Sequence, residues 1–477
     1  MNYKLNKQLA DITTHAKAIA KNISSQKKIV IVHHHDADGI ASASILAKAF
    51  QNLGKSFSTV AMKQLYKESI NEIMKHEQQN DCLYTFVDFG ASHIRDLEHF
   101  FGKSFVVIDH HQPKYPKSEN FLNCWHFGLN GSTEACAASL SYLVADALLG
   151  EKSEELASIA IIGALGDMQD SSGQLTGLNK AILDEAQKNG YIKVMRDLRL
   201  YGRFTRPLVQ FIAYSTDPMI PGLTGNEDNV AKFLLENGFE LKRNEKWLCY
   251  EDLSFEEKQK LVTALIIYMR SIDLPEWKIT RLIGEVYTLL GEPFGPLRDA
   301  KEYATLLNAC GRNDCPEVGL ELCLGDRGHF YGQALGILAE HRKNLREGLE
   351  LMIEEGLQEA RNFYYFNAGS RIKDSLVGVV AGMLYSSNII PTEKPIVAFA
   401  EQSDGFLKVS ARATQELIMK GLNLGLVMRA CCEELGFGSE GGGHQVAAGA
   451  KIPKDKLNDF IWLLDKKLGE HFNTKQE

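Results

Sequence analysis

Short apolar runs alternate with helix-like segments along the first 190 residues. KKIVIVHH, LYTFVDFG and SFVVIDHH have the length and the β-branched or aromatic content of buried strands. GIASASILAKAFQNLG and ASHIRDLEHFFG follow the first two runs and carry apolar residues at helical spacing. STEACAASLSYLVADALLG and EELASIAIIGALGDMQD are two further helical segments. This alternation predicts an α/β fold in which a parallel sheet is flanked by helices.

Between residues 191 and 303 the sequence pattern is mostly typical of helices. The main segments are KWLCYEDLSFEEKQKLVTALIIYMRSI and EWKITRLIGEVYTLLG. We therefore predict an all-α insertion there. On a helix, YIKVMRDLRLYGRFTRP would align its basic residues in one stripe, with Tyr201 and Phe204 among them. Such a stripe favours either a path for single-stranded nucleic acid or a plain solvated face. The basic residues are Lys193, Arg196, Arg199, Arg203 and Arg206.

The last third of the chain predicts a smaller α/β domain behind a long connecting helix. The helix is GQALGILAEHRKNLREGLELMIEEGLQEARN, and strand-like text returns from about residue 363. IVAFAEQSDGFLKVSARA is typical of two strands around a Ser-Asp-Gly turn. The predicted domains are 1–190, 191–303 for the insertion, 304–362 for a core segment with the connecting helix, and 363–477.

Composition changes this picture little. With 477 residues, 44% hydrophobic and 24% charged, the chain has the balance of a globular protein of more than one domain. No apolar run approaches the roughly 20 residues that span a bilayer, and nine irregularly spaced cysteines suit a reducing compartment. We therefore expect a cytoplasmic protein without a membrane partner. The net charge of −8 still allows a nucleic-acid enzyme, since acidic metal ligands add negative charge.

Acids and histidines follow each of the three predicted strands, where open α/β sheets bind their ligands. They are His33, His34, His35, Asp36 and Asp38 after the first strand, Asp88 after the second, and Asp109, His110 and His111 after the third. Asp167 ends a predicted helix with an apolar face, where a lone charge would be costly. Which of the three consecutive histidines joins the acids stays open. Alternation along an extended strand favours His34, two residues before Asp36.

This set of side chains indicates a metal centre. Carboxylates with imidazoles and without thiolates suit Mn²⁺ or Mg²⁺, and the histidines favour Mn²⁺. The set is larger than one ion with open positions needs, whereas two ions about 3.5–4 Å apart and bridged by a carboxylate would use it well. Such a pair activates a water and clamps the oxygens of a phosphate. The sequence therefore predicts hydrolysis of a phosphate ester or anhydride.

HHDADGIAS, VDFGAS, IDHHQP and GALGDMQD resemble the four motifs of the DHH phosphoesterase superfamily. The resemblance implies that Asp88 bridges two metal ions, that Asp109 and His111 serve catalysis, and that His111 meets the scissile phosphate. Val32 stands where several relatives carry a histidine. The metal ligands implied by the resemblance are His34, Asp36, Asp38, Asp88, His110 and Asp167.

Other segments bear on the substrate. A helix predicted to begin at Ser132 and Thr133 either binds a phosphate at its N-terminus or is merely capped there. Ser410 and Arg412 share one face of a predicted strand. KVSARA and GGGHQVAAG resemble the DHH-associated domain that grips nucleotides, and LNACGR resembles a RecJ segment whose Asn308 and Arg312 would contact backbone phosphates. The candidate substrate-binding residues are Ser132, Thr133, Asn308, Arg312, Ser410, Arg412, Gly441, Gly442, Gly443 and His444.

Length and insertion are most similar to the GINS-associated nucleases of the RecJ group. The resemblance implies a single-strand-specific exonuclease with two Mn²⁺ ions, or Mg²⁺ as the alternative, a GINS complex as partner and a role in DNA replication or repair. One alternative is a phosphodiesterase for short oligoribonucleotides or cyclic dinucleotides. Another is a non-catalytic GINS-binding scaffold. The polarity of degradation, the choice of DNA or RNA, the oligomeric state and the role of the insertion stay open.

Overall fold

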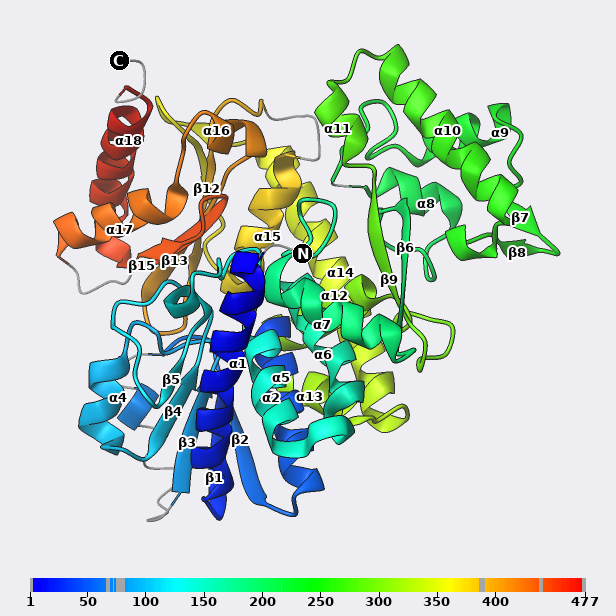
Figure 1. Cartoon of the computed structure of the whole chain (residues 1–477). Coiled ribbons are helices and arrows are strands. Elements are labelled where there is room, and N and C mark those ends of the chain that lie inside the picture. The colour runs from blue at the N-terminus through cyan, green and yellow to red at the C-terminus, as the bar shows by residue number, and fades with distance from the viewer. Residues whose placement is uncertain are drawn as a thin grey trace. The chain divides into compact units, whose positions relative to one another are not determined.

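The computed structural model describes residues 3–65, 69–71, 73, 82–215, 217–385, 391–436 and 441–473. The chain divides into two units, whose elements are labelled in Figure 1. The first consists of Met1–Pro218 and Ala231–Leu338, and the second of Met219–Val230 and Ala339–Glu477. The four predicted domain ranges stay predictions.

A parallel five-stranded sheet of order β2-β1-β3-β4-β5 is the centre of the first unit (Figure 1). The strands are β1 (Lys28–His34), β2 (Ser56–Met62), β3 (Cys82–Val87), β4 (Phe105–Ile108) and β5 (Phe121–Leu122). The three predicted strands are β1, β3 and β4. Their apolar runs are continuous because both faces of the sheet are covered. The pattern had not indicated the partly exposed edge strand β2 or the two-residue β5.

Both faces of this sheet pack against apolar side chains. Ile29 and Ile31 point into the larger core, while Val30 and Val32 point into the smaller one, as alternation along a strand requires. The helices of the larger core include α2 and α5, and α4 lies on the smaller one. The helices around the sheet are α1 (Tyr3–Ser24), α2 (Ala37–Asn52), α4 (Ile94–Phe101), α5 (Ala137–Leu149), α6 (Ala157–Gly166) and α7 (Gly177–Lys188). The predicted α/β class is confirmed.

The strand register aligns the carboxyl ends of the three predicted strands. His33 of β1 pairs with Val87 of β3, and Val87 pairs with Ile108 of β4. The next residue of each strand is therefore His34, Asp88 or Asp109. Pairing of the parallel strands thus brings together side chains that lie 21 to 75 positions apart in the sequence.

The prediction of an all-α insertion is wrong, because an antiparallel ribbon of two strands frames it and a second pair of short strands lies within it. β6 (Ile192–Leu198) pairs with β9 (Ile283–Leu289) from Ile192 opposite Leu289 to Leu198 opposite Ile283. Both strands lie in segments that the sequence pattern predicted to be helical. The pairing between the two strands determines their structure despite the helical spacing of the basic residues. The other elements are α8 (Leu208–Ala213), α9 (Glu227–Glu236), β7 (Lys242–Arg243), β8 (Lys246–Trp247), α10 (Phe255–Ser271) and α11 (Glu276–Thr280).

The predicted basic stripe does not exist as a helix face. Lys193 and Arg196 are exposed on β6, whereas Arg199 and Arg203 are buried beyond it. Arg203 binds the carboxylates of Asp197 and Glu251. Arg199 is likewise paired with Asp170, so the five basic residues form neither a helical path for a single strand nor a continuous solvated face.

The second unit contains a mixed six-stranded sheet of order β10-β11-β12-β13-β15-β14. As predicted, β12 and β13 form an antiparallel hairpin around the Ser-Asp-Gly turn. Separate apolar clusters cover the two faces of the sheet, one including α17 and α18 and the other α15. The strands are β10 (Gln358–Glu359), β11 (Tyr364–Asn367), β12 (Ile396–Glu401), β13 (Phe406–Arg412), β14 (Gly442–Gly443) and β15 (Ala447–Pro453), and the helices are α15 (Asp374–Leu384), α16 (Gln415–Met419), α17 (Leu424–Leu435) and α18 (Leu457–Asn473).

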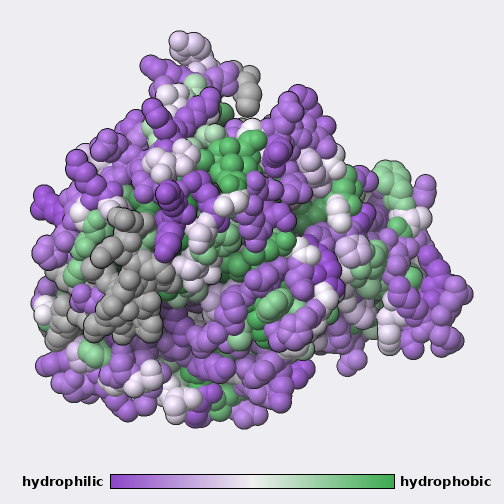
Figure 2. Space-filling view, turned by 90° about the horizontal axis from the view of Figure 1, so that it is seen from below, coloured by the Kyte–Doolittle hydropathy of each residue, from purple (hydrophilic) through white to green (hydrophobic). Residues whose placement is uncertain are grey.

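Three helices follow the ribbon: α12 (Ala300–Arg312), α13 (Pro316–Leu324) and the long α14 (His329–Glu355), which is the predicted connecting helix. Among the described residues, no helix combines the length and the apolar character that crossing a membrane requires. Seen from below, the surface is mostly hydrophilic with smaller apolar areas (Figure 2).

Candidate metal centre

The six predicted metal ligands meet at the carboxyl edge of the five-stranded sheet. They form two groups, in each of which one ligand atom per residue lies within 4.8 Å of the others. His34 and Asp36 share one group with Asp88, and Asp38, His110 and Asp167 make up the other. β1 ends at the first of these residues, α2 begins beside the two acids that follow, and Asp167 caps the end of α6.

Asp88 lies between the two groups. One of its carboxylate oxygens, Oδ2, is 3.2 Å from His34 Nδ1, and the other, Oδ1, is 3.2 Å from His110 Nε2. The residue is buried and has a left-handed backbone with φ of 67°. Non-glycine residues rarely adopt this conformation, and where they do the site is often functional. Asp88 thus has the position of a carboxylate that bridges two cations.

The remaining contacts define the two groups. His34 Nδ1 is 2.9 Å from Asp36 Oδ2. His110 Nε2 is 3.3 Å from Asp167 Oδ2 and 3.8 Å from Asp38 Oδ2. The two imidazoles therefore each point one nitrogen at carboxylates, as ligands of a common cation would.

The hydrogen bonds of these residues fit a metal. His34 Nδ1, His110 Nε2 and Asp88 Oδ1 are buried without a hydrogen-bond partner, which is costly unless something else binds them. His110 Nδ1 donates to the carbonyl of Gly131 at 2.6 Å, so its Nε2 presents a lone pair to the centre. A divalent cation in each group would satisfy these atoms.

The structure separates the three consecutive histidines. His33 is buried and donates from Nδ1 to the carbonyl of His34 at 2.8 Å, and burial lowers its pKa to about 4. Burial, together with the charge of His34, lowers the pKa of His35 to about 3. Of the three, His34 is the one placed beside Asp88.

Asp109 belongs to a third group of possible ligands, with Asp88, His110 and His111, and its carboxylate supports His111. Its Oδ2 accepts the backbone N–H of Ala91 at 2.8 Å, and its Oδ1 accepts both the backbone N–H of His111 at 3.0 Å and its ring Nδ1–H at 2.8 Å. Burial opposes its charge, but His111 outweighs burial and holds the pKa of Asp109 below its usual range. The half-exposed imidazole of His111 is thereby oriented by a fixed carboxylate.

Comparison with known proteins places this geometry in a family. The chain matches the DHH family N-terminal domain over residues 28–165, the DHH-CID domain over 200–283 and the DHHA1 domain over 363–470. An uncharacterized protein of Methanocaldococcus jannaschii is 33% identical over 470 residues, which is 97% of this chain and 98% of that protein. The chain belongs to the RecJ-like DHH superfamily.

One sequence relative matches part of the chain, and two solved structures have a similar fold. The single-stranded-DNA-specific exonuclease RecJ of Escherichia coli is 32% identical over 165 residues, which cover 32% of this chain and only 27% of RecJ. RecJ from Thermus thermophilus in complex with Mn²⁺ has a TM-score of 0.57 at 16% identity, covering 96% of this chain and 55% of that one. CDC45 from Entamoeba histolytica has a TM-score of 0.63 at 14% identity, covering 94% and 97%. These structures show a shared fold.

Within the DHH domain, a buried polar network that sequence reasoning missed supports His110. The carbonyl of Gly131 accepts from His110 and also from Gln169 Nε2, at 2.9 Å. Asn179 Nδ2 donates to Gln169 Oε1 at 2.6 Å, and the hydroxyl of Ser139 donates to Asn179 Oδ1 at 2.6 Å. The only signal in the sequence was the place of Gln169, two residues after Asp167.

Three side chains of the centre of this DHH protein have raised pKa values. Burial and the charge of Asp88 raise the pKa of Asp38 to about 7, and burial and the charge of Asp38 raise the pKa of Asp167 well above its usual value. Burial opposes the charge of His110, but its interactions with Asp88 and Asp167 raise the pKa of its imidazole well above the ordinary value.

We therefore predict that Mn²⁺ binding releases protons. Ligands must be deprotonated, and groups with raised pKa values keep their protons at neutral pH. The apparent affinity should fall as the pH drops below about 7, by roughly tenfold per pH unit for each proton released. Calorimetric titration with Mn²⁺ in two buffers of different ionisation enthalpy measures this. Equal heats in both buffers would show that no proton leaves.

The predicted helix start at Ser132 and Thr133 is wrong. Both residues are exposed in a turn, and α5 begins at Ala137. The first amides of α5 bind a side chain of the centre: Ala137 N–H donates to Asp38 Oδ2 at 2.7 Å, and Ala138 N–H donates to Oδ1 at 2.9 Å. This helix N-terminus therefore holds Asp38, and the reason for expecting a phosphate there no longer applies.

Asn308 and Arg312 lie beside the centre on α12. Asn308 Oδ1 accepts the backbone N–H of Ala37 at 3.1 Å, in the first turn of α2. Burial lowers the pKa of Arg312, and the nearby charge of Asp36 opposes this effect. Arg312 thus brings a positive charge to the edge of the centre. Their contacts with a phosphate stay predictions.

The predicted substrate residues of the DHHA1 domain lie on neighbouring strands. Ser410 of β13 pairs with Gly449 of β15, which pairs with Gly442 of β14. A side chain at Gly378 of α15 would meet Arg412 Nη2 at 2.6 Å and Ser410 Oγ at 3.0 Å. Gly443 has φ of 134°, which only glycine adopts readily, while Gly441 packs against α17 and His444 is exposed.

Proposed function

We propose that this chain is a metal-dependent exonuclease that hydrolyses the phosphodiester bonds of single-stranded nucleic acid. The observation that carries the proposal is the position of Asp88 between two groups of histidine and carboxylate ligands. Membership of the RecJ-like DHH superfamily supports a phosphoesterase, and the relatives named RecJ support a single-stranded substrate. Mn²⁺ is the proposed ion, with Mg²⁺ as the alternative.

The proposed mechanism assigns each residue a task. His34 and Asp36 would hold one cation, Asp38, His110 and Asp167 the other, and Asp88 both. When bound, the cations would activate a water and neutralise charge on the phosphate. The backbone amides of α5 fix Asp38 in place. Asp109 orients the ring of His111, which would meet the scissile phosphate.

Binding of the strand is assigned to both domains. Arg312 would neutralise a backbone phosphate near the centre. In the DHHA1 domain, Arg412 and the glycines of β14 would hold the terminal nucleotide, because glycines let backbone N–H groups approach a phosphate closely. Ser132 and Thr133 are left out of this assignment.

Digestion of end-labelled strands tests the proposal. With Mn²⁺, single-stranded DNA or RNA labelled at one end is expected to release short products, and a duplex or a circular strand to stay intact. Cleavage of the circular strand would contradict exonuclease action. Activity confined to strands of a few nucleotides would instead favour the phosphodiesterase for short oligoribonucleotides or cyclic dinucleotides.

We also propose a GINS complex as a partner in DNA replication or repair, with residues 191–303 as the docking surface. The resemblance of the chain's length and insertion to those of GINS-associated nucleases supports this proposal. Mixing the chain with purified GINS is expected to give one joint peak in size-exclusion chromatography. Separate elution would overturn it.

A further inference from the structure

The turn that follows α6 carries Asp167 on a backbone with little structure of its own. Residues 167–173 are held internally by turn hydrogen bonds, such as Gln169 N–H to Ala164 O at 3.0 Å and Gly173 N–H to Asp170 O at 2.8 Å. Met168 has a left-handed backbone with φ of 56° and an exposed side chain. The backbone N–H of Asp167 is bound to Gly163 of α6, and contacts from outside fix the residues of the turn that follow.

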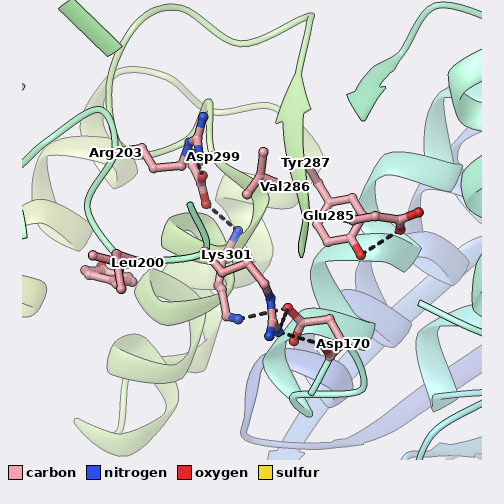
Figure 3. Close-up of a pocket in the computed structure, with 10 residues that line it drawn as sticks. Asp170, Leu200, Arg203, Glu285, Val286, Tyr287, Asp299 and Lys301 are labelled. Atoms are coloured by element: carbon pink, nitrogen blue, oxygen red, sulfur yellow. Dashed lines mark hydrogen bonds and ion pairs between the residues drawn. The ribbon is translucent and has the colours of Figure 1, made fainter. Parts of the chain in front are cut away.

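Gln169 and Asp170 are both fixed from outside this turn: Gln169 by Gly131, Ala135 and Asn179, and Asp170 by two cations. Asp170 is buried, and Arg199 Nη2 donates to its Oδ2 at 2.8 Å and to its carbonyl at 2.6 Å. Lys301 Nζ donates to the same Oδ2 at 2.9 Å. Figure 3 shows the carboxylate of Asp170 facing the ammonium of Lys301 beside a small cavity. Two cations from different segments thus hold one carboxylate.

Arg199 connects this carboxylate to the ribbon. Its backbone N–H donates to Leu282 O at 3.0 Å, at the end of the β6–β9 pairing. A side chain at Gly284 would meet Arg199 Cδ at 2.4 Å, so the guanidinium stem lies directly on β9. The N–H of Glu285 also donates to Gly173 O at 2.8 Å, which ties the far end of the turn to the same strand.

Lys301 connects the carboxylate of Asp170 to α12, which also contacts the turn that carries Asp36. Lys301 lies in the first turn of α12, and Asn308 of the same helix binds the Ala37 N–H between Asp36 and Asp38. Gly311, near the end of the helix, packs against the carbonyl of His35. One helix therefore contacts both ligand-bearing turns.

Stability alone is a poor reason for such a buried cluster. Removing two cations and a carboxylate from water is expensive, and apolar residues of the same size would often serve stability as well. Fixed geometry is a better reason, since outer partners of metal ligands commonly set metal affinity.

We propose that Asp170 is a positioning residue for Asp167, held by Arg199 and Lys301 so that the β6–β9 ribbon and α12 set the metal affinity of the Asp38, His110 and Asp167 group. The proposal rests on the metal centre of the proposed function. It requires no contact between Asp170 and the metal or the substrate.

Calorimetric titration of Asp170→Asn with Mn²⁺, without nucleic acid, tests this proposal. The variant keeps the shape of the side chain but not its charge. We expect one of two Mn²⁺ sites to weaken by about 10–100-fold, the usual effect of losing an outer partner, and the other to keep its affinity. Asp459→Asn is the matched control, because the exposed Asp459 of the second unit pairs with the exposed Lys456, and both sites should be unchanged.

Lys301→Gln provides a second variant that removes only one of the two cations. It should weaken the same site in the same direction, by less. Circular dichroism checks that each variant is folded. A folded variant whose two Mn²⁺ affinities both equal those of the wild type would overturn the proposal. So would a folded variant in which both affinities are weakened equally. A wild type that binds two Mn²⁺ but cleaves no nucleic acid would reject the proposed function and leave this comparison intact.

Discussion

Asp88→Ala is expected to lower the rate of Mn²⁺-dependent hydrolysis on the order of 10³-fold, since metal ions supply several kcal/mol of transition-state stabilisation and each 1.36 kcal/mol is a factor of ten. No other side chain of the centre contacts both histidines, His34 and His110, at 3.2 Å. Its loss removes a ligand from both groups at once. Single-strand digestion and Mn²⁺ titration should therefore fail together.

Asp459→Ala serves as the control for this variant, because its carboxylate is exposed and belongs to the second unit. It should leave both the rate and the metal affinity unchanged. An Asp88→Ala protein that binds Mn²⁺ and digests strands like wild type would reject the bridging role. A wild type without any turnover would favour the non-catalytic scaffold.

Gly311→Ala is expected to destabilise the fold by about 1–3 kcal/mol, the usual cost of overpacking. The new Cβ would lie 1.7 Å from the carbonyl oxygen of His35 and 3.5 Å from the backbone nitrogen of Asp36. Backbone atoms cannot swing away as a flexible side chain can, so α12 must move from the turn that carries Asp36. Mn²⁺ affinity should fall with stability.

Gly336→Ala is the matched control in another helix. Nothing lies within 4 Å of its added Cβ, so it should raise stability by up to about 1 kcal/mol through helix propensity. Urea denaturation of both variants measures the difference. If Gly311→Ala stabilised the protein as much as Gly336→Ala, α12 would not pack on the centre as described.

The elements that could be predicted from the sequence are those whose structure depends on the pattern of neighbouring residues. β1, β3 and β4 were recognisable because strands buried on both faces are apolar throughout. The ribbon was missed because β6 and β9 are nearly a hundred residues apart, and each has helical spacing when taken alone. Arg199 and Arg203 seemed to form an exposed stripe for the same reason. Their acidic partners were not recognisable from neighbouring positions.

The sequence likewise indicated some residues of the metal centre and not others. Its candidate ligands stood out in the sequence because Asp36, Asp88 and His110 are unusual residues at the ends of apolar strands. The supporting network did not, since Gly131 and Asn179 act through contacts that only the folded chain creates. Asp109 belongs between these cases: the motif identified it, but only its hydrogen bonds show that it orients His111.

Anomalous diffraction from crystals grown with Mn²⁺ tests the central claim most directly. The account predicts two peaks, one beside His34 and Asp36 and the other beside Asp38, His110 and Asp167, with the carboxylate of Asp88 between them. A single peak away from Asp88, or no peak at these residues, would contradict it.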